Sequence, residues 1–511
     1  MYNTNELNNE YTAAADIHPT EPISFRVARW SNNPYSKGAW SQLLVGGSPH
    51  DREQLSKPIS NSFILAGEAT VPDFPSQVHG AYISGKRAAK WCLDSISSNA
   101  SSKPLLIVVI GAGAAGISAA DTIRKSLNSD SNSDSNSNPN SDHNNKHKVI
   151  IVEALNHLGG RATTISMGDG IRVDAGGTWI QQYKNNPLVP EALRFGLHLI
   201  PTDFMSPIAS CADGPVSVDD INEMVLQIET AAQLHHTNVE HDTSVMKIIN
   251  DYIYPKYQDN PRMLRLIELS IAEIMADTGI PLDTLSSNYG LEEPSYVGEG
   301  DHYIREGFST LLSKIASDIE IRYNTPIKVI DWGEDINSTS VKLTTSTNEV
   351  INADYCICTV PISILQESMM NENTNKILTI HPPLPMDHQN SLNKMKMAIC
   401  DKVILRFSHR WWPTSSTSNN ILKWYGDRST DNNNDNNDNN NNYGNSYTDI
   451  LDATDGLGVP LVVLYMIGED NIKKHMDGRT DKEIAYDAYK TLQNWSISIK
   501  RDKDLLLNQN I

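Results

Sequence analysis

The stretch LLIVVIGAGAAGISAA, residues 105–120, decides the fold of this chain. Its six leading apolar residues predict a buried β-strand, and the small residues at its end favour a helix. Between them, Gly111, Gly113 and Gly116 let backbone N–H groups and the helix N-terminus approach a pyrophosphate. The stretch therefore predicts a Rossmann-type dinucleotide site, and the alternative is a glycine-rich turn that serves packing alone.

A second predicted strand, residues 149–152, ends at Glu153. An acid at the tip of that strand can accept hydrogen bonds from a ribose diol, whereas the alternative is a solvated loop acid. Glu153 lies 42 positions after Gly111 instead of the usual roughly 20. A low-complexity run of Asn, Ser and Asp at residues 128–147 accounts for the excess, because a surface insertion costs little loop-closure entropy.

The composition predicts a cytoplasmic protein of more than one domain. The chain has 511 residues, of which 39% are hydrophobic, and no apolar run approaches the roughly 20 residues of a membrane span. A net charge of −20 argues against nucleic acid as the main partner. The five cysteines form no CxxC pair, so we expect buried apolar residues; we expect no metal either, with His235 and His236 on a solvated helix face.

The N-terminal part of the chain carries a long motif, RW…P.S.G.WS…AGE.T…VHGA..SG. Its residues are Arg29, Trp30, Pro34, Ser36, Gly38, Trp40, Ser41, Ala66, Gly67, Glu68, Thr70, Val78, His79, Gly80, Ala81, Ser84 and Gly85. With this motif the chain resembles the flavin-dependent amine oxidase family, which includes polyamine oxidases, monoamine oxidases and the amine-oxidase-type histone demethylases.

In that family the RW…AGE block closes the chain, whereas here it precedes the Rossmann motif. Each family block is present once, so we infer a circular permutation, which neighbouring surface termini would permit. A misjoined gene model or a truncated tandem duplicate is the competing explanation.

The resemblance implies an α/β fold in which a Rossmann-like FAD-binding domain is interleaved with a mixed α+β substrate-binding domain. In chain order we expect a mobile lead-in (1–21), an FAD-binding segment (22–98), a linker (99–104), the Rossmann core (105–184), a helical substrate segment (185–298), a further FAD-binding segment (299–366) and a substrate segment (367–511) that contains a low-complexity insert (431–442).

The resemblance also implies which residues bind FAD. Arg161 in the Gly159-Gly160-Arg161 turn would bind the FAD phosphates, and residues 176–179 would pass along the flavin. No cysteine lies between Gly46 and Ala66, where covalently flavinylated members keep their anchor, so FAD is expected to be noncovalent. The full set of predicted cofactor residues is Gly67, Glu68, Gln77, Val78, Gly111, Gly113, Ala114, Ala115, Gly116, Glu153, Ala154, Gly159, Gly160, Arg161, Gly176, Gly177, Thr178, Trp179 and Ile327.

Lys402 matches a lysine that in the family holds a water against flavin N5, although a lysine at a strand start is ordinarily a solvated charge. The predicted substrate pocket contains Trp40, Gln77 across from it, and Gln181. Polyamine-specific members commonly carry His or Glu where this chain has Gln181, which argues against strict polyamine selectivity. The resemblance implies oxidation of a small amine, a polyamine or a monoamine, by O2 to an imine or aldehyde and hydrogen peroxide.

Three alternatives to this function remain. The chain could be another flavoenzyme of the same fold, such as a desaturase or an amino-acid oxidase that uses Arg406 or Arg410 for the substrate carboxylate. It could be a degenerate flavin-binding protein, or an NAD-dependent dehydrogenase, which Arg161 and the AGE segment disfavour. The sequence predicts no oligomeric state.

Overall fold

The computed structural model describes residues 11–12, 19–99, 103–132, 147–211, 214–238, 241–291, 300–333, 337–370, 376–415, 420–425 and 449–508. Several predicted features lie outside the described residues: most of the lead-in, residues 100–102 of the linker, most of the insert at 128–147, and all of the insert at 431–442.

The sequence stretch that decides the fold forms the centre of a parallel sheet. Its strand order is β12-β6-β5-β16-β4, and every neighbouring pair is parallel. The strands are β5 (Leu105–Ile110), β6 (His147–Val152), β12 (Glu320–Arg322), β16 (Tyr355–Cys358) and β4 (Phe63–Leu65). This arrangement confirms the predicted Rossmann-like core.

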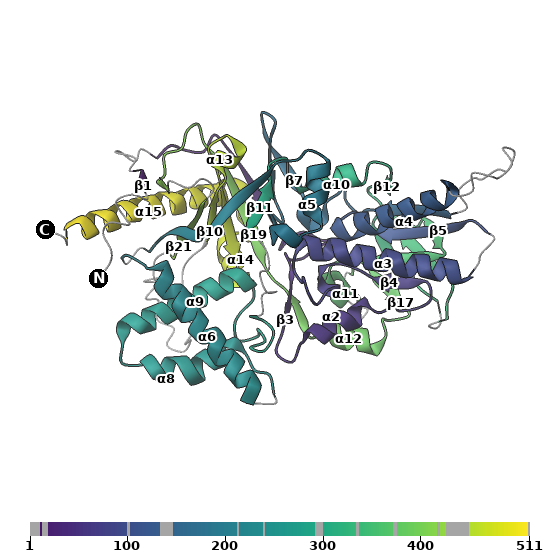
Figure 1. The fold of residues 1–511 in the computed structure, drawn as a ribbon, viewed down its shortest axis with the longest axis horizontal. Coiled ribbons are helices and arrows are strands. Elements are labelled where there is room, and N and C mark those ends of the chain that lie inside the picture. Colours follow the sequence, from purple (N-terminus) through teal and green to yellow (C-terminus); the bar gives the residue numbers. More distant parts are fainter. Residues whose placement is uncertain are drawn as a thin grey trace.

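Two helices cover one face of this sheet. Helices α3 (Val78–Asn99) and α4 (Ala114–Asn132) run side by side over it, and Ile107 and Val109 pack against them (Figure 1). Because successive strand residues point to opposite faces, Val108 and Ile110 pack on the other side. There they meet a four-stranded sheet of β13 (Ile327–Asp331), β14 (Val341–Thr345), β15 (Val350–Ala353) and β17 (Thr379–His381).

Short elements extend this half of the molecule. Helices α2 (Pro49–Ser56), α11 (Ile362–Ser368) and α12 (Met386–Leu392) lie beside the pair of β3 (Ser41–Leu43) and β18 (Met395–Met397). Helices α5 (Leu188–Arg194) and α10 (Phe308–Ile315) pack near α4, and β7 (Thr164–Gly168) forms a hairpin with β8 (Ile171–Asp174).

The second half of the molecule is built on an eight-stranded sheet with the order β2-β19-β23-β22-β21-β10-β11-β9. Its strands are β2 (Ser24–Ala28), β19 (Cys400–Arg406), β23 (Leu461–Ile467), β22 (Asp449–Asp452), β21 (Asn420–Trp424), β10 (Leu199–Ser210), β11 (Asp301–Ile304) and β9 (Trp179–Ile180). The long helix α15 (Asp481–Asn508) covers one face through Ile484, Leu492 and Trp495. The opposite face of β19 and β23 is turned toward Trp40 and Trp179.

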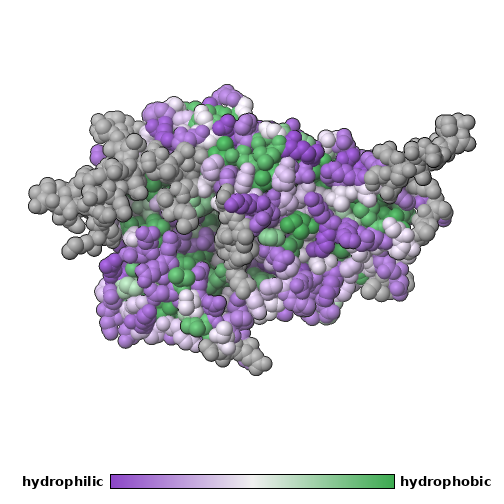
Figure 2. Space-filling view, in the orientation of Figure 1, coloured by the Kyte–Doolittle hydropathy of each residue, from purple (hydrophilic) through white to green (hydrophobic). Residues whose placement is uncertain are grey.

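A helical lobe adjoins this sheet. It contains α6 (Val218–Asn238), α7 (Val245–Ile248), η4 (Ile249–Ile253), α8 (Tyr254–Tyr257) and α9 (Pro261–Thr278), drawn in teal at the lower left of Figure 1. The small helices α13 (Thr454–Leu457) and α14 (Glu469–His475) flank β23. Figure 2 shows hydrophilic side chains over much of the visible face, interrupted by apolar patches.

The two sheets exchange more strands than the sequence suggests. Strands β2, β9 and β11 come from the segments predicted to bind FAD, yet they join the eight-stranded sheet. Conversely, β17 lies in a predicted substrate segment but pairs with β13, and the predicted helical segment contributes β10. In the predicted mobile lead-in, β1 (Tyr11–Thr12) pairs with β20 (Thr414–Ser415). These differences arise because a strand joins the ladder that pairs its backbone groups, which can come from any part of the chain.

Among the described residues, none of the helices has the length and apolar character that a membrane crossing requires.

Candidate functional site: a dinucleotide cradle beside a buried lysine

The turn after β5 has open space beside Gly113, whereas Gly116 is packed so closely that no side chain fits there. Gly111 has φ +102°, and a Cβ on Gly116 would lie 1.9 Å from the Gly111 carbonyl oxygen, so helix α4 needs glycine there to pack. A Cβ on Gly113 would meet only the Gly159 carbonyl oxygen, at 3.9 Å. Helix α4 begins at Ala114 and Ala115, so its N-terminus faces this open position.

Glu153 stands at the tip of β6 beside this turn, as the sequence predicts. The backbone N–H of Ala112 donates to its Oε2 at 2.7 Å, and the N–H of Leu155 donates to Oε1 at 2.8 Å. The residue is buried, and this burial raises the pKa of its carboxyl group. Ala154 follows it at the same edge, and Ile327 opens the neighbouring β13 and is buried.

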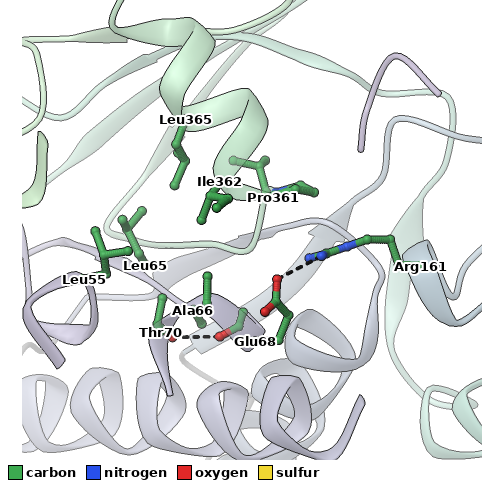
Figure 3. Close-up of a pocket in the computed structure, with 12 residues that line it drawn as sticks. Leu55, Leu65, Ala66, Glu68, Thr70, Arg161, Pro361, Ile362 and Leu365 are labelled. Carbon is green, nitrogen blue, oxygen red and sulfur yellow. Dashed lines mark hydrogen bonds and ion pairs between the residues drawn. The ribbon is translucent and has the colours of Figure 1, made fainter. Parts of the chain in front are cut away.

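A small pocket next to the turn joins the AGE segment to the Gly-Gly-Arg turn (Figure 3). Arg161 Nη1 donates to Glu68 Oε1 at 2.9 Å and to the Ala39 carbonyl oxygen at 3.0 Å. Burial alone would raise the pKa of Glu68, but the charges of Arg161 and Arg52 lower it overall. The lining residues are Leu55, Leu65, Ala66, Gly67, Glu68, Ala69, Thr70, Arg161, Val360, Pro361, Ile362 and Leu365.

The segment from Gly176 to Thr178 crosses from this pocket to the second half of the molecule. A Cβ on Gly176 would lie 1.8 Å from the Arg161 carbonyl oxygen, and one on Gly177 would lie 2.8 Å from Val78 Cγ2. The Gly177 N–H donates to the Arg161 carbonyl oxygen at 2.8 Å. The structure therefore brings together the predicted glycine pairs at 159–160 and 176–177, Arg161 and the start of α3.

Lys402 is buried at the end of this segment, with 5% of its surface exposed. Its Nζ donates to the Gly176 carbonyl oxygen and, at 2.7 Å, to Thr178 Oγ1. Burial lowers the pKa of Lys402 to about 8. The strand-start lysine is thus not a solvated charge, because β19 lies between β2 and β23 in the sheet.

Two aromatic rings form a wall beside Lys402. Tyr465 is its partner across the β19–β23 ladder, and Lys402 Nζ lies 4.7 Å from the centre of the Tyr465 ring. Trp179 stacks on Tyr465 with ring centres 5.6 Å apart and an angle of 19° between the planes. The Tyr465 hydroxyl lies 3.4 Å from Thr178 Oγ1.

A buried carboxylate supports this arrangement from behind. Thr164 Oγ1 donates to Asp174 Oδ1 at 2.6 Å, and the N–H of Phe308 at the start of α10 donates to the same oxygen at 3.0 Å. Burial raises the pKa of Asp174 to about 7, while these hydrogen bonds and the charge of Lys402 act in the opposite direction.

The three predicted substrate-pocket residues differ in what the structure says of them. Trp40 is half-buried and packs against the apolar cluster that contains Tyr465 and Trp179. Gln77 immediately precedes α3, and its Oε1 is buried without a hydrogen-bond partner among the described residues. Asn186 Nδ2 donates a hydrogen bond to the backbone carbonyl oxygen of Gln181. This contact does not involve the Gln181 side chain, so the place of that side chain in the substrate pocket stays a prediction.

Sequence reasoning missed some residues of the site. Tyr465 lies in a run of seven buried strand residues, and only its register opposite Lys402 marks it out. Ser76 and Arg52 carry no motif signal in the sequence. Asp174 directly precedes the Ala-Gly-Gly-Thr-Trp run and could have been found there.

These residues fit a dinucleotide. The open position at Gly113, the N-terminus of α4 and Arg161 suit phosphates, and the partnerless Gln77 Oε1 is an acceptor that a ligand can use. The fold and the site together define a dinucleotide-binding protein of the Rossmann type, with a buried lysine and a pair of stacked aromatic rings beside the site.

Comparison with known proteins gives the family. The sequence profile of the flavin containing amine oxidoreductases matches residues 8–93 and 276–508, and that of an NAD(P)-binding Rossmann-like domain matches residues 109–194. Because the first profile covers more than half of the chain, the chain belongs to the flavin-containing amine oxidoreductase family. Membership implies a flavin cofactor.

Individual relatives are more distant. The chain is 23% identical over 351 residues to a lysine-specific histone demethylase 1B homolog of Caenorhabditis elegans, covering 63% of this chain and 39% of that protein. It is 25% identical over 347 residues to a corticosteroid-binding protein of Candida albicans, covering 63% and 64%. Over 72 residues, 14% of each chain, it is 46% identical to polyamine oxidase 2 of Arabidopsis thaliana. The chain thus spans less than two thirds of the length of each relative.

A solved structure agrees with the fold. A putrescine oxidase double mutant redesigned in cofactor binding aligns with a TM-score of 0.50 and 12% identity, covering 77% of this chain and 82% of that one. At this identity the match supports the fold alone.

Proposed function

We propose that this protein uses noncovalent FAD to oxidise a C–N bond of a small amine, a polyamine or a monoamine, with O2 as the acceptor. The observation that carries the proposal is the burial of Lys402 against residues 176–178, with the Trp179–Tyr465 wall beside it. Bound FAD would supply the two-electron oxidation, and imine hydrolysis would release the aldehyde and an amine product, with hydrogen peroxide formed from O2.

The chain's own residues would hold the cofactor and orient the substrate. Glu153 would accept hydrogen bonds from the adenosine ribose, while Arg161 and the N-terminus of α4 would bind the diphosphate. Lys402 would hold a water at the reacting end, and the aromatic wall would exclude bulk water and face the amine. Noncovalent binding is favoured because no cysteine lies between Gly46 and Ala66, where covalently flavinylated members of the family keep their anchor.

An amine is favoured over an amino acid because both candidate arginines are already engaged by carboxylates. Arg406 Nη1 lies 2.8 Å from Asp169 Oδ2, and Arg410 Nη2 lies 3.1 Å from Asp452 Oδ2 and 2.9 Å from Asp455 Oδ2. Binding a substrate carboxylate would require breaking these pairs.

We also propose that the chain is a circular permutant of its family. The N-terminal block packs into the molecule as an integral part: β4 pairs with β16, β2 pairs with β19, and Trp30 Nε1 donates to the Ala175 carbonyl oxygen at 2.7 Å. Arg29 reaches the start of α15, where it forms an ion pair of 2.7 Å with Asp481. These contacts favour a working permutation over a misjoined gene.

The test is the visible flavin spectrum of the purified full-length protein, recorded anaerobically before and after addition of spermine, spermidine, their acetylated forms and simple monoamines. Bleaching of a bound flavin by one of them is the expected result. Bleaching only by amino acids or by a methyl-lysine peptide would overturn the proposed substrate class, and the absence of bound flavin would overturn the cofactor assignment.

The rate of flavin reduction should rise with pH, since only the unprotonated amine carries a lone pair that can support oxidation at its α-carbon. Stopped-flow reduction from pH 6 to pH 10 checks this, with the flavin content measured at each pH as the control. A flat profile with chemistry limiting the rate would contradict the expectation.

A further inference from the structure

Arg52 is an arginine that the proposed mechanism does not use, and it lies in the interior. Arg52 belongs to helix α2 and is 2% exposed. An arginine is almost never fully buried in a protein unless it has partners. Its Nη1 donates to Ser41 Oγ at 2.7 Å, and its Nη2 donates to the Ser41 carbonyl oxygen at 3.2 Å. Arg52 therefore binds both the side chain and the backbone of one residue, Ser41.

Ser41 connects Arg52 to Glu68 by a hydrogen bond. The Ser41 hydroxyl donates to Glu68 Oε2 at 2.6 Å, and the other oxygen of Glu68 receives Arg161 at 2.9 Å. Glu68 is 5% exposed and lines the pocket in which Arg161 also stands (Figure 3). The order of contacts is thus Arg52, Ser41, Glu68, Arg161, and we call this set the Glu68 network.

The Glu68 network also fixes the start of α3. Ser76 Oγ donates to the Ser41 carbonyl oxygen at 2.6 Å, and the Ser76 N–H donates to Glu68 Oε2 at 3.0 Å. Ser76 has φ +66°, a conformation that costs a non-glycine residue energy and persists only where its surroundings impose it. It directly precedes Gln77 and Val78, two of the predicted cofactor residues.

The charge of the Glu68 network is unbalanced toward positive. Glu68 carries one negative charge, and Arg52 and Arg161 carry two positive charges, so within the Glu68 network one positive charge is left over. Without Arg52, Glu68 would neutralise Arg161. A diphosphate is the ligand chemistry that this surplus favours.

We propose that Arg52 is a positioning residue for FAD: it holds Ser41, and through Ser41 and Glu68 it keeps Arg161 and the Ser76 turn in the arrangement that binds the diphosphate and the flavin. The inference rests on the proposed use of FAD. It goes beyond it because Arg52 itself does not line the pocket.

The test measures FAD affinity of the apoprotein by quenching of flavin fluorescence, together with the melting temperature of the apoprotein. For Arg52→Met the dissociation constant should rise by about tenfold to a hundredfold, the loss expected for hydrogen bonds to a charged group. Arg52→Lys keeps the positive charge but not the paired donors Nη1 and Nη2 that bind Ser41, and it should recover part of the lost affinity. Arg479→Met is the control, since Arg479 also donates to a backbone carbonyl oxygen, that of His475, but lies far along the chain beside α15.

Glu68→Gln supplies the second test, which holds even if Arg52→Met folds poorly. If Arg52 acts through the Glu68 network, Arg52→Lys should weaken FAD binding far less in the Glu68→Gln background than in the wild-type background. Equal effects in both backgrounds, or an Arg52→Met apoprotein that binds FAD within about twofold of wild type, would overturn the inference. Wild-type protein that binds no FAD would instead refute the proposed function.

Discussion

At the scale of single residues, Lys402 concentrates the chemistry of the site. Its Nζ is held by the Gly176 carbonyl oxygen and Thr178 Oγ1, and its ring neighbour is Tyr465. Lys402→Met keeps the length of the side chain but removes the charge and the donors. We expect flavin reduction to slow by about a hundredfold or more while bound FAD stays near wild-type content.

Lys473→Met is the control for this substitution, because Lys473 is an exposed lysine paired with Glu469 on α14. Rapid-reaction reduction by the best amine measures the effect. A Lys402→Met protein that is reduced at the wild-type rate would remove Lys402 from the mechanism.

The buried pair Lys402 and Asp174 should make stability depend on pH in two windows. Burial lowers the pKa of Lys402 from 10.5 to about 8, so between these values the unfolded chain holds more protons and the free energy of unfolding rises with pH. Burial raises the pKa of Asp174 from 3.8 to about 7, so in that window the folded chain holds more protons and the free energy of unfolding falls as pH rises.

Urea unfolding of the apoprotein against pH measures both effects. The unfolding free energy of wild type minus that of Lys402→Met should increase by up to about 3 kcal/mol from pH 8 to pH 10.5. Asp174→Asn should remove the slope in the acidic window alone. Parallel curves for wild type and Lys402→Met would show that the lysine titrates normally.

At the scale of elements, two glycines of the β5–α4 turn have different roles: Gly116 is needed for packing, and Gly113 leaves space for the ligand. A Cβ at Gly116 would lie 1.9 Å from the Gly111 carbonyl oxygen, so Gly116→Ala should destabilise the apoprotein by about 1–3 kcal/mol or more, the range of overpacked sites. A Cβ at Gly113 meets only an atom at 3.9 Å, so Gly113→Ala should leave the melting temperature nearly unchanged. Gly113→Ala should still weaken FAD binding, because the methyl group enters the space of the diphosphate.

Melting curves of both apoproteins and titrations with FAD test this contrast. If Gly113→Ala binds FAD as tightly as wild type does, the diphosphate does not approach this turn.

At the scale of the whole molecule, the contacts of the N-terminal block do not depend on where the chain is cut. Helix α3 packs on α4, and β4 closes the edge of the parallel sheet, whichever end of the chain supplies them. A rearranged chain that begins at Lys103 and ends at Asn99, with the present ends joined through residues 1–18, should therefore fold and bind FAD with the same visible spectrum.

Its melting temperature should lie within a few degrees of that of the present chain, since the same surfaces are buried. Failure of the rearranged protein to fold would show that the order of blocks in this sequence is required.

The sequence by itself determined the parts of the protein whose physics is local. Residues 105–120 specify a strand, a glycine turn and a helix start through apolar periodicity and the absence of side chains, and Glu153 follows at a strand tip. Only the tertiary structure decided which distant groups meet. Lys402 is buried because β2 and β23 pair on both sides of β19, and Arg52 acts on Ser41 because α2 folds back on β3. Such contacts depend on long-range packing and desolvation, which residue order along the chain does not encode locally.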